Sequence, residues 1–226
     1  TLDGLIKHNG PLDSTEKIDL IIGKNYFKKK IKFHKQPTLE AQIASISDDI
    51  AYNSHDLEDG LKANLFTIND LKYIPILSDI IKIHEKRINK LNQDLFIRQI
   101  VREIIDVMVK DIIYSIKKNI RINNIKTIND IYNLNKAIVT FSSEMNLFNI
   151  LIKRFLKKNM YLNKDIQKKT NQGKKIIKKL FLYVNKNPKK FFLTKNLNKK
   201  SKNRIVCDFI AGMTDRYAIE LYKKIK

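Results

Sequence analysis

Cysteine is almost absent from this sequence, because Cys207 is the only one among 226 residues. A disulfide within the chain is therefore excluded, and so is a zinc site built from several thiolates. The apolar residues around Cys207 favour a small buried packing residue over a reactive thiol. A chain with this cysteine content suits the reducing cytoplasm.

Long apolar runs are also missing. No stretch approaches the roughly 18 uninterrupted apolar residues of a membrane-spanning helix, and no charged segment followed by an apolar run indicates a secretory signal. We therefore expect a soluble, cytoplasmic protein without membrane contact. The first residue is Thr1 rather than Met, and the sequence that follows it reads as the middle of an amphipathic element. We expect a fragment or a processed piece of a longer protein.

Strand-like alternation never exceeds four residues, and no internal repeat occurs, so the predicted fold class is all-α. A long helix is predicted over residues 95–120, where apolar residues recur every three or four positions on a face wide enough to be covered on both sides, as in a helical bundle. Helices are also predicted over residues 67–92, from 127 for a short stretch, and over 142–156, 174–184 and 203–225. Residues 11–36 and 189–202 are predicted to be loops.

Arginine and acidic residues are scarce beside lysine. Lysine and arginine total 45 against 23 aspartates and glutamates, which gives a net charge of +22, and only seven of the basic residues are arginine. Arginine is the residue expected where phosphate groups are recognised in a bidentate manner. The abundance of lysine, isoleucine and asparagine together is typical of A/T-rich codons. Weak, salt-sensitive adhesion to polyanions follows from the charge, and nucleic-acid binding remains an alternative function.

The segment from Pro37 to Gly60 contains no lysine at all. Its period predicts a helix over residues 38–60 with Thr38 as its cap. One face carries the apolar residues Leu39, Ile43, Ile46 and Ile50, which we expect to be buried. Asp48, Tyr52 and Asp56 follow one another at intervals of four residues on nearly the opposite face.

This opposite face belongs to an unusually acidic stretch. Five carboxylates occur within twelve residues, namely Asp48, Asp49, Asp56, Glu58 and Asp59. Such a group can hold a cation, and the ring of Tyr52 between two carboxylates offers a flat surface for a sugar or a base. The alternative interpretation is an ordinary solvated helix face.

Three segments resemble, in the same order, motifs of the bacterial dGTP triphosphohydrolase-like proteins of the HD superfamily. The third metal-ligand region of that family is resembled by four short segments: Glu40-Ala41-Gln42, residues 48–53, His55-Asp56-Leu57 and Asp59-Gly60-Leu61. Residues 7–11, Lys-His-Asn-Gly-Pro, and residues 207–217, from Cys207 to Tyr217, resemble its flanking motifs. The resemblance implies an HD-type helical bundle with a C-terminal helical extension. Residues 1–66 would be the downstream part of the catalytic domain, and residues 67–226 would pack on it.

The activity implied by the resemblance is hydrolysis of a deoxynucleoside triphosphate to a deoxynucleoside and triphosphate. The reaction would use a divalent metal, Mg²⁺, Mn²⁺ or another transition metal, in a protein that forms homo-oligomers. Asp48 would be a metal ligand, Tyr52 would lie against the deoxyribose, and Asp56 would accept a hydrogen bond from the 3′-hydroxyl. Lys7 would contact phosphate, with His8 beside it facing the pocket.

The remaining metal ligands of that family have no match here. The family uses a histidine and a consecutive His-Asp pair upstream, whereas His55-Asp56 lies within the third region and is not that pair. The four histidines are His8, His34, His55 and His84, and no two of them stand four residues apart on a helix. His34 and His84 are predicted to lie on the surface. We therefore expect the C-terminal portion of such an enzyme, inactive alone. Alternatively, it is a nucleic-acid-binding module or a remnant that assembles with full-length partners.

Overall fold

The computed structural model describes residues 2–16, 18, 31–85, 93–192 and 199–225, and every regular element among them is a helix. The predicted all-α class is therefore confirmed. Packing divides the chain into two compact units, Thr1–Met160 and Tyr161–Lys226. This division follows packing alone, so the assignment of residues 1–66 to a catalytic domain remains a prediction. Half of the predicted loop at 11–36 and the end of the helix predicted up to residue 92 lie outside the described residues.

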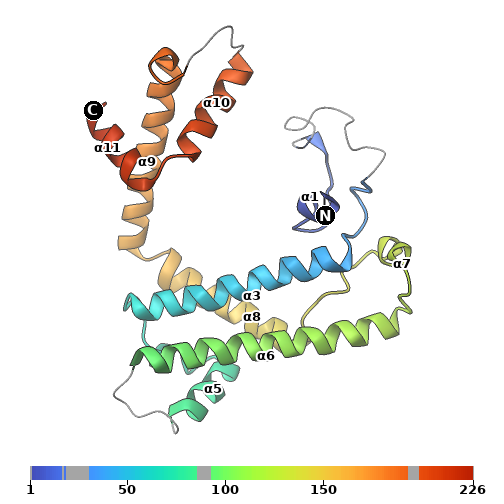
Figure 1. Cartoon of the computed structure of the whole chain (residues 1–226). Coiled ribbons are helices and arrows are strands. Elements are labelled where there is room, and N and C mark those ends of the chain that lie inside the picture. Colours follow the sequence, from blue (N-terminus) through green and yellow to red (C-terminus); the bar gives the residue numbers. More distant parts are fainter. Residues whose placement is uncertain (1, 17, 19–30, 86–92, 193–198, 226) are drawn as a thin grey trace. The chain divides into compact units, whose positions relative to one another are not determined.

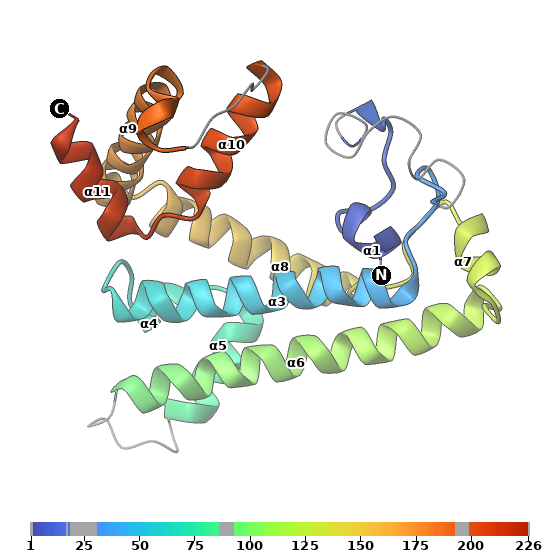
Figure 2. The ribbon, with the colours of Figure 1, turned by 45° about the horizontal axis from the view of Figure 1, so that its top comes forward.

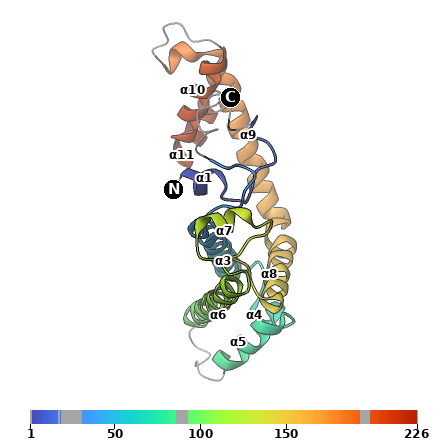
Figure 3. The same ribbon diagram turned by 90° about the vertical axis from the view of Figure 1, so that its right-hand side faces the viewer.

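Two long helices form the frame of the first unit. Helix α3 (Leu39–Lys62) and helix α6 (Gln93–Ile122) lie side by side, as Figures 1 and 2 show. Helix α8 (Ser143–Leu156) packs beside α3. Figure 3, in which α3 and α6 are seen nearly end-on, shows α8 next to them. The shorter elements of this unit are α1 (Leu2–Ile6), which contacts α3, α4 (Ile68–Leu71), α5 (Pro75–Glu85), which contacts α6, and α7 (Ile128–Asn133). None of the described helices is both long and apolar enough to cross a membrane.

Capping side chains set the starts of α3, α7 and α8 at the predicted residues. The helix predicted over residues 67–92 is instead interrupted, since α4 ends at Leu71 and α5 begins at Pro75. The Thr38 hydroxyl accepts a hydrogen bond from the Ala41 amide, and the Ser142 hydroxyl accepts one from the Met145 amide. Thr67 and Thr127 each form a reciprocal capping box with an aspartate three residues later. These contacts satisfy amide groups that have no partner inside the helix, so each helix begins at a defined residue.

The core of the first unit is built on the apolar face of α6. Its buried residues include Ile97, Ile100, Val101, Ile104, Met108 and Ile112, and α3 and α5 both pack against this helix. The prediction of a wide apolar face covered from two directions is confirmed. The observed helix extends two residues beyond the predicted range of 95–120 at each end.

The predicted apolar stripe of α3 is only partly correct. Ile50 is buried and Leu39 and Ile46 are partly buried, but Ile43 is 41% exposed. The buried face of α3 instead includes the polar residues Gln42, Asn53 and Ser54. A pattern of apolar residues assumes that amides face water, whereas Gln42 and Asn53 have hydrogen-bond partners inside the fold.

The second unit packs α10 (Lys199–Ala211) and α11 (Asp215–Lys224) against α9 (Lys164–Lys186). Its buried apolar residues are Ile176, Leu180, Val184, Val206, Ile210 and Ala218. The π-helix η1 (Lys157–Tyr161) precedes α9 along the chain, and the 3₁₀ helix η2 (Pro188–Lys190) follows it. Figure 3 shows α10 and α11 beside α9.

Three predictions for the second unit need correction. Helix α9 begins ten residues before the predicted start at 174, because Asn163 caps it by accepting hydrogen bonds from the Asp165 and Ile166 amides. The predicted single helix over 203–225 is two helices, since the Thr214 hydroxyl accepts from the Tyr217 amide and starts a new one. Helix α10 also starts at Lys199, inside the predicted loop.

Two side chains differ in burial from what the sequence predicted. Cys207 is exposed on α10 rather than buried. His84 is buried rather than exposed, and its Nε2 lies 3.8 Å from a carboxylate oxygen of Glu103. Local sequence failed in both cases because the neighbours that decide burial come from other helices.

Candidate functional site

Lys7 is fully buried at the base of the loop that follows α1. Its Nζ donates hydrogen bonds to the carbonyl oxygens of Lys32, Lys35 and Gln36 over 3.1 to 3.3 Å, and it lies 2.8 Å from Asp3. The ammonium group therefore joins the first residues of the chain to residues 32–36. Its predicted contact with phosphate stays a prediction, because in this structure its donors are directed at protein oxygens.

The next residue, His8, lies over helix α3 beside Asp48. The Nε2 atom of His8 is 3.7 Å from Oδ2 of Asp48, a separation longer than a hydrogen bond. Both side chains remain accessible, at 43% for His8 and 68% for Asp48. The fold therefore brings together an imidazole and a carboxylate that stand forty residues apart in the sequence.

Tyr52 and Asp56 continue along α3 one and two turns beyond Asp48. Tyr52 is 63% exposed and Asp56 is partly buried. Their spacing of four residues places them on the same side of the helix as Asp48. The structure thus places Asp48, Tyr52 and Asp56 along one side of α3 with His8 beside Asp48. Lys7 is held separately, by Asp3 and by the carbonyl oxygens of residues 32–36.

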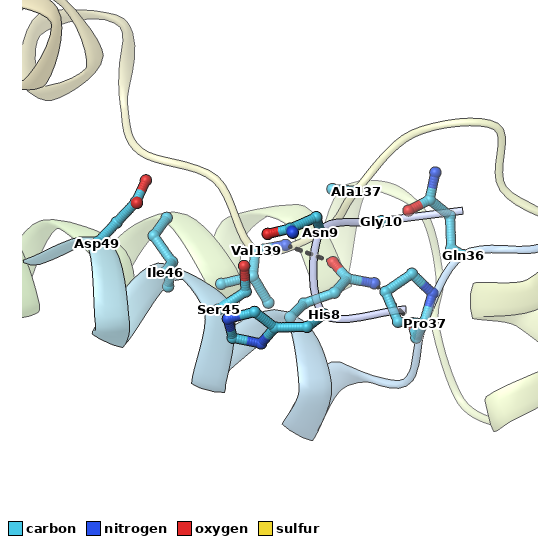
Figure 4. Close-up of a pocket in the computed structure, with 11 residues that line it drawn as sticks. His8, Asn9, Gly10, Gln36, Pro37, Ser45, Ile46, Asp49, Ala137 and Val139 are labelled. Atoms are coloured by element: carbon cyan, nitrogen blue, oxygen red, sulfur yellow. Dashed lines mark hydrogen bonds between the residues drawn. The ribbon is translucent and has the colours of Figure 1, made fainter. Parts of the chain in front are cut away.

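A cavity of about 320 Å³ lies beside this surface (Figure 4). It is lined by the loop after α1, the segment before α3, α3 itself and the segment before α8: His8, Asn9, Gly10, Gln36, Pro37, Gln42, Ser45, Ile46, Asp49, Ala137 and Val139. His8 contributes to this cavity and is also within reach of Asp48. The cavity therefore opens next to the predicted metal ligand.

The side chain of Gln42 on α3 makes hydrogen bonds to the segment before α3 and to the segment before α8, a role that the sequence did not reveal. Its Oε1 accepts hydrogen bonds from the amides of Ile138 and Val139 at 2.9 and 3.1 Å, and its Nε2 donates to the Pro37 carbonyl at 2.9 Å. The only sequence signal was its place in the Glu40-Ala41-Gln42 motif. An amide partner nearly a hundred residues away cannot be read from local pattern.

Some of the acidic residues around the site are already neutralised by lysines. Asp49 pairs with Lys153 of α8 at 2.7 Å. Glu58 pairs with Lys62, and the hydrogen bond from Lys62 holds the pKa of the Glu58 carboxyl below its ordinary value, with a smaller contribution from His55. Ion pairs with lysines from outside residues 37–60 therefore reduce the negative charge of this segment. Asp48 is the carboxylate that faces His8.

The side chains present do not by themselves make a complete metal site. No group of three or more histidine, cysteine, aspartate or glutamate side chains that could hold a metal ion occurs within the described part of the chain. His8 and Asp48 offer two donors, whereas divalent metals in proteins take about four to eight ligands. No reaction step can therefore be derived through a metal held by these residues alone.

Comparison with known protein families identifies one domain within the chain. Residues 139–224 match the phosphohydrolase-associated domain. This range begins in the first unit and covers most of the second, so it includes α8 as well as the helices packed around α9.

The whole chain is similar to the deoxyguanosinetriphosphate triphosphohydrolase-like proteins. It is 48% identical over 225 residues to that of Pelagibacter ubique (strain HTCC1062), covering all of this chain and 60% of the relative. The proteins of that name from Caulobacter sp. (strain K31) and Bartonella quintana (strain Toulouse) are 34% and 33% identical, again over the whole chain and over 59% and 58% of their lengths. The resemblance carried by the sequence motifs is thus confirmed, and the chain spans about 60% of the length of the curated relatives it matches.

Proposed function

We propose that this chain forms part of a metal-dependent deoxynucleoside triphosphate triphosphohydrolase of the cytoplasm. The observation that carries the proposal is the similarity over the entire chain to proteins named as dGTP triphosphohydrolase-like. The reaction would convert a deoxynucleoside triphosphate and water into a deoxynucleoside and inorganic triphosphate. The active assembly would be a homo-oligomer.

Each predicted site residue has a role in this proposal. Asp48 would bind Mg²⁺ or Mn²⁺, Tyr52 would lie against the deoxyribose, and Asp56 would accept a hydrogen bond from the 3′-hydroxyl. The placement of the three residues on one side of α3, with His8 close to Asp48, supports a shared site. Lys7 would contact phosphate, which requires its ammonium group to exchange a carbonyl oxygen for a phosphate oxygen.

The remaining metal ligands would come from a polypeptide that corresponds to the part of the relatives not matched by this chain. Accordingly, the purified chain alone should release no triphosphate from dGTP with either Mg²⁺ or Mn²⁺. Substantial release by the chain alone would overturn this division of ligands.

A chimera tests whether the chain supplies a working part of such an enzyme. The matching 225 residues of the Pelagibacter relative would be replaced by this chain, and triphosphate release from dGTP with Mn²⁺ would be compared with that of the unaltered relative. We expect activity in the chimera, and a loss of at least about a hundredfold in its Asp48→Asn variant, because a metal ligand would lose its charge.

Asp106→Asn is the matched control, since Asp106 on α6 pairs with Lys110 and does not line the cavity. It should change the chimera's activity by only a few-fold. A folded chimera without activity beside an active relative would count against the proposal. Equal losses in the two variants would count against Asp48 as the metal ligand.

A further inference from the structure

The positive charge of this protein is concentrated in its last part. Residues 161–226 contain nineteen lysines and arginines against four aspartates and glutamates, so this stretch carries +15 of the net charge of +22. Codon composition alone would spread lysine along the chain. The excess of lysine in this part of the chain therefore has to do with the surface that these residues form.

Helix α9 contributes the largest share of this charge. Seven of its lysines are exposed, and six of these fall within an arc of about 120° at 100° per residue, a surface that we name the lysine face of α9. It consists of Lys164, Lys168, Lys174, Lys175, Lys178 and Lys186. The buried residues Ile176, Leu180 and Val184 occupy the other side, where α10 and α11 pack. Within the second unit, packing thus directs the lysines to solvent.

The one carboxylate on α9 is Asp165 in its first turn, against eight lysines on the same helix. Two of the four acidic residues of the unit are paired elsewhere, Asp208 with Arg204 and Glu220 with Arg216. Across the described residues, none of the six lysines takes part in an ion pair within 4.0 Å. Their charges therefore remain available to a ligand of opposite sign.

We propose that the lysine face of α9 binds the phosphate backbone of duplex nucleic acid. From Lys164 to Lys186 the helix rises by roughly 33 Å, which is close to one turn of a B-form duplex. Lysines on a rigid rod of this length can neutralise several phosphates at once and release their counterions. This inference is independent of the proposed hydrolase site, which lies in the first unit.

The composition of the face favours backbone contact over other anionic partners. It carries no aromatic side chain on which bases could stack, so recognition of single strands or of sequence is not expected. An anionic membrane requires a continuous apolar face beside the charges, but Ile176, Leu180 and Val184 of α9 are buried in packing. Of the two exposed apolar residues of this helix, Ile177 and Leu182, only Leu182 lies among the lysines.

The test measures binding of the full chain to a fluorescein-labelled DNA duplex of about two helical turns, by anisotropy between about 50 and 200 mM salt. The variant is Lys168→Gln/Lys175→Gln/Lys178→Gln. The control is Lys62→Gln/Lys82→Gln/Lys110→Gln, which removes the same charge from lysines of the first unit that pair with acidic residues. Circular dichroism confirms that both variants are folded.

We expect the α9 variant to bind roughly tenfold or more weakly and to lower the slope of log K against log salt by about 2.7, the value for three lost phosphate contacts. The control should stay within about twofold of the parent. Absent duplex binding, equal losses in the two variants, or tighter binding to phosphatidylserine vesicles than to the duplex would each overturn the proposal.

Discussion

The side-chain amide of Asn53 on α3 donates a hydrogen bond of 2.8 Å to Oδ1 of Asn149 on α8, and both residues are buried. This contact joins two helices through residues that are 96 positions apart in the sequence. A buried polar pair is favourable only while both members are present, because a lone donor or acceptor loses its hydration without compensation.

Replacing one member of this pair should therefore cost more than replacing both. We expect Asn149→Leu to lower the free energy of unfolding by about 1 to 3 kcal/mol, and Asn53→Leu/Asn149→Leu to recover much of that loss. Urea denaturation followed by circular dichroism measures the four corners of the cycle. Asn146→Leu, at an exposed position on the same helix, is the control and should change stability little. Strictly additive losses would contradict this account.

Two helical glycines should respond in opposite directions to alanine. A Cβ atom at Gly60 on α3 would lie 2.3 Å from ring atoms of Phe66, whereas one at Gly173 on α9 would meet nothing within 4 Å. The Phe66 ring also packs edge-on against Phe155 with centroids 4.7 Å apart, so it has little room to move. We expect Gly60→Ala to destabilise the protein by about 1 to 3 kcal/mol through overcrowding.

Gly173→Ala should instead stabilise α9 by about 0.5 to 1 kcal/mol, because alanine loses less conformational freedom in a helix. Thermal denaturation of the two variants provides the comparison. A gain in stability for Gly60→Ala would show that the Phe66 ring can yield to a methyl group.

Loss of the Gln42 side chain should loosen the cavity beside the candidate site. Gln42→Ala would leave the buried amides of Ile138 and Val139 without their acceptor, at a cost of about 2 to 4 kcal/mol. Hydrogen exchange measured by NMR should show faster exchange at these two amides. Gln167→Ala, at an exposed position on α9, removes the same side chain without such contacts and should leave both rates unchanged. Unchanged exchange in Gln42→Ala would contradict the role assigned to Gln42.

The capping box of α7 should make its stability dependent on acid. Hydrogen bonds from the Lys126 and Thr127 amides, and from the Thr127 hydroxyl, lower the pKa of Asp130 below its ordinary value. Because the folded-state pKa is depressed, the stabilisation is complete well above pH 3.8 and is lost as the pH falls through the folded value.

Asp130→Asn should accordingly lower the melting temperature near pH 7, with the difference from the parent shrinking at acid pH. Asp79→Asn, which removes the same charge from an exposed residue of α5, is the control for general charge effects. A difference that stays constant down to the lowest pH would rule out the proposed cap contribution.

Local pattern predicted much of the helical content. The four-residue spacing of Asp48, Tyr52 and Asp56 and the three-to-four spacing along α6 depend only on the helical period, which neighbouring residues impose. Caps such as Thr38 and Thr127 are equally local. The start of α9 and the break before α11 differ from the predicted ranges because their caps, Asn163 and Thr214, lie where the apolar pattern indicates no helix start.

The site itself depended on contacts between distant segments. Motif order in the sequence pointed to the family that the chain resembles and predicted Lys7, His8 and Asp48 as site residues. It could not show that Lys7 is buried among carbonyl oxygens or that His8 lies 3.7 Å from Asp48. The hydrogen bonds of Gln42 to Ile138 and Val139, and that of Asn53 to Asn149, could likewise not be predicted from the sequence. Hydrogen bonds between residues nearly a hundred positions apart leave no periodic pattern.

The sequence by itself determined the all-helical class, the helix faces and the family to which the motifs point, because each of these depends on short-range periodicity or on the order of motifs. Only the tertiary structure decided which polar side chains are buried and which carboxylates are already paired. The physical reason is that burial and pairing are set by side chains that come from other helices.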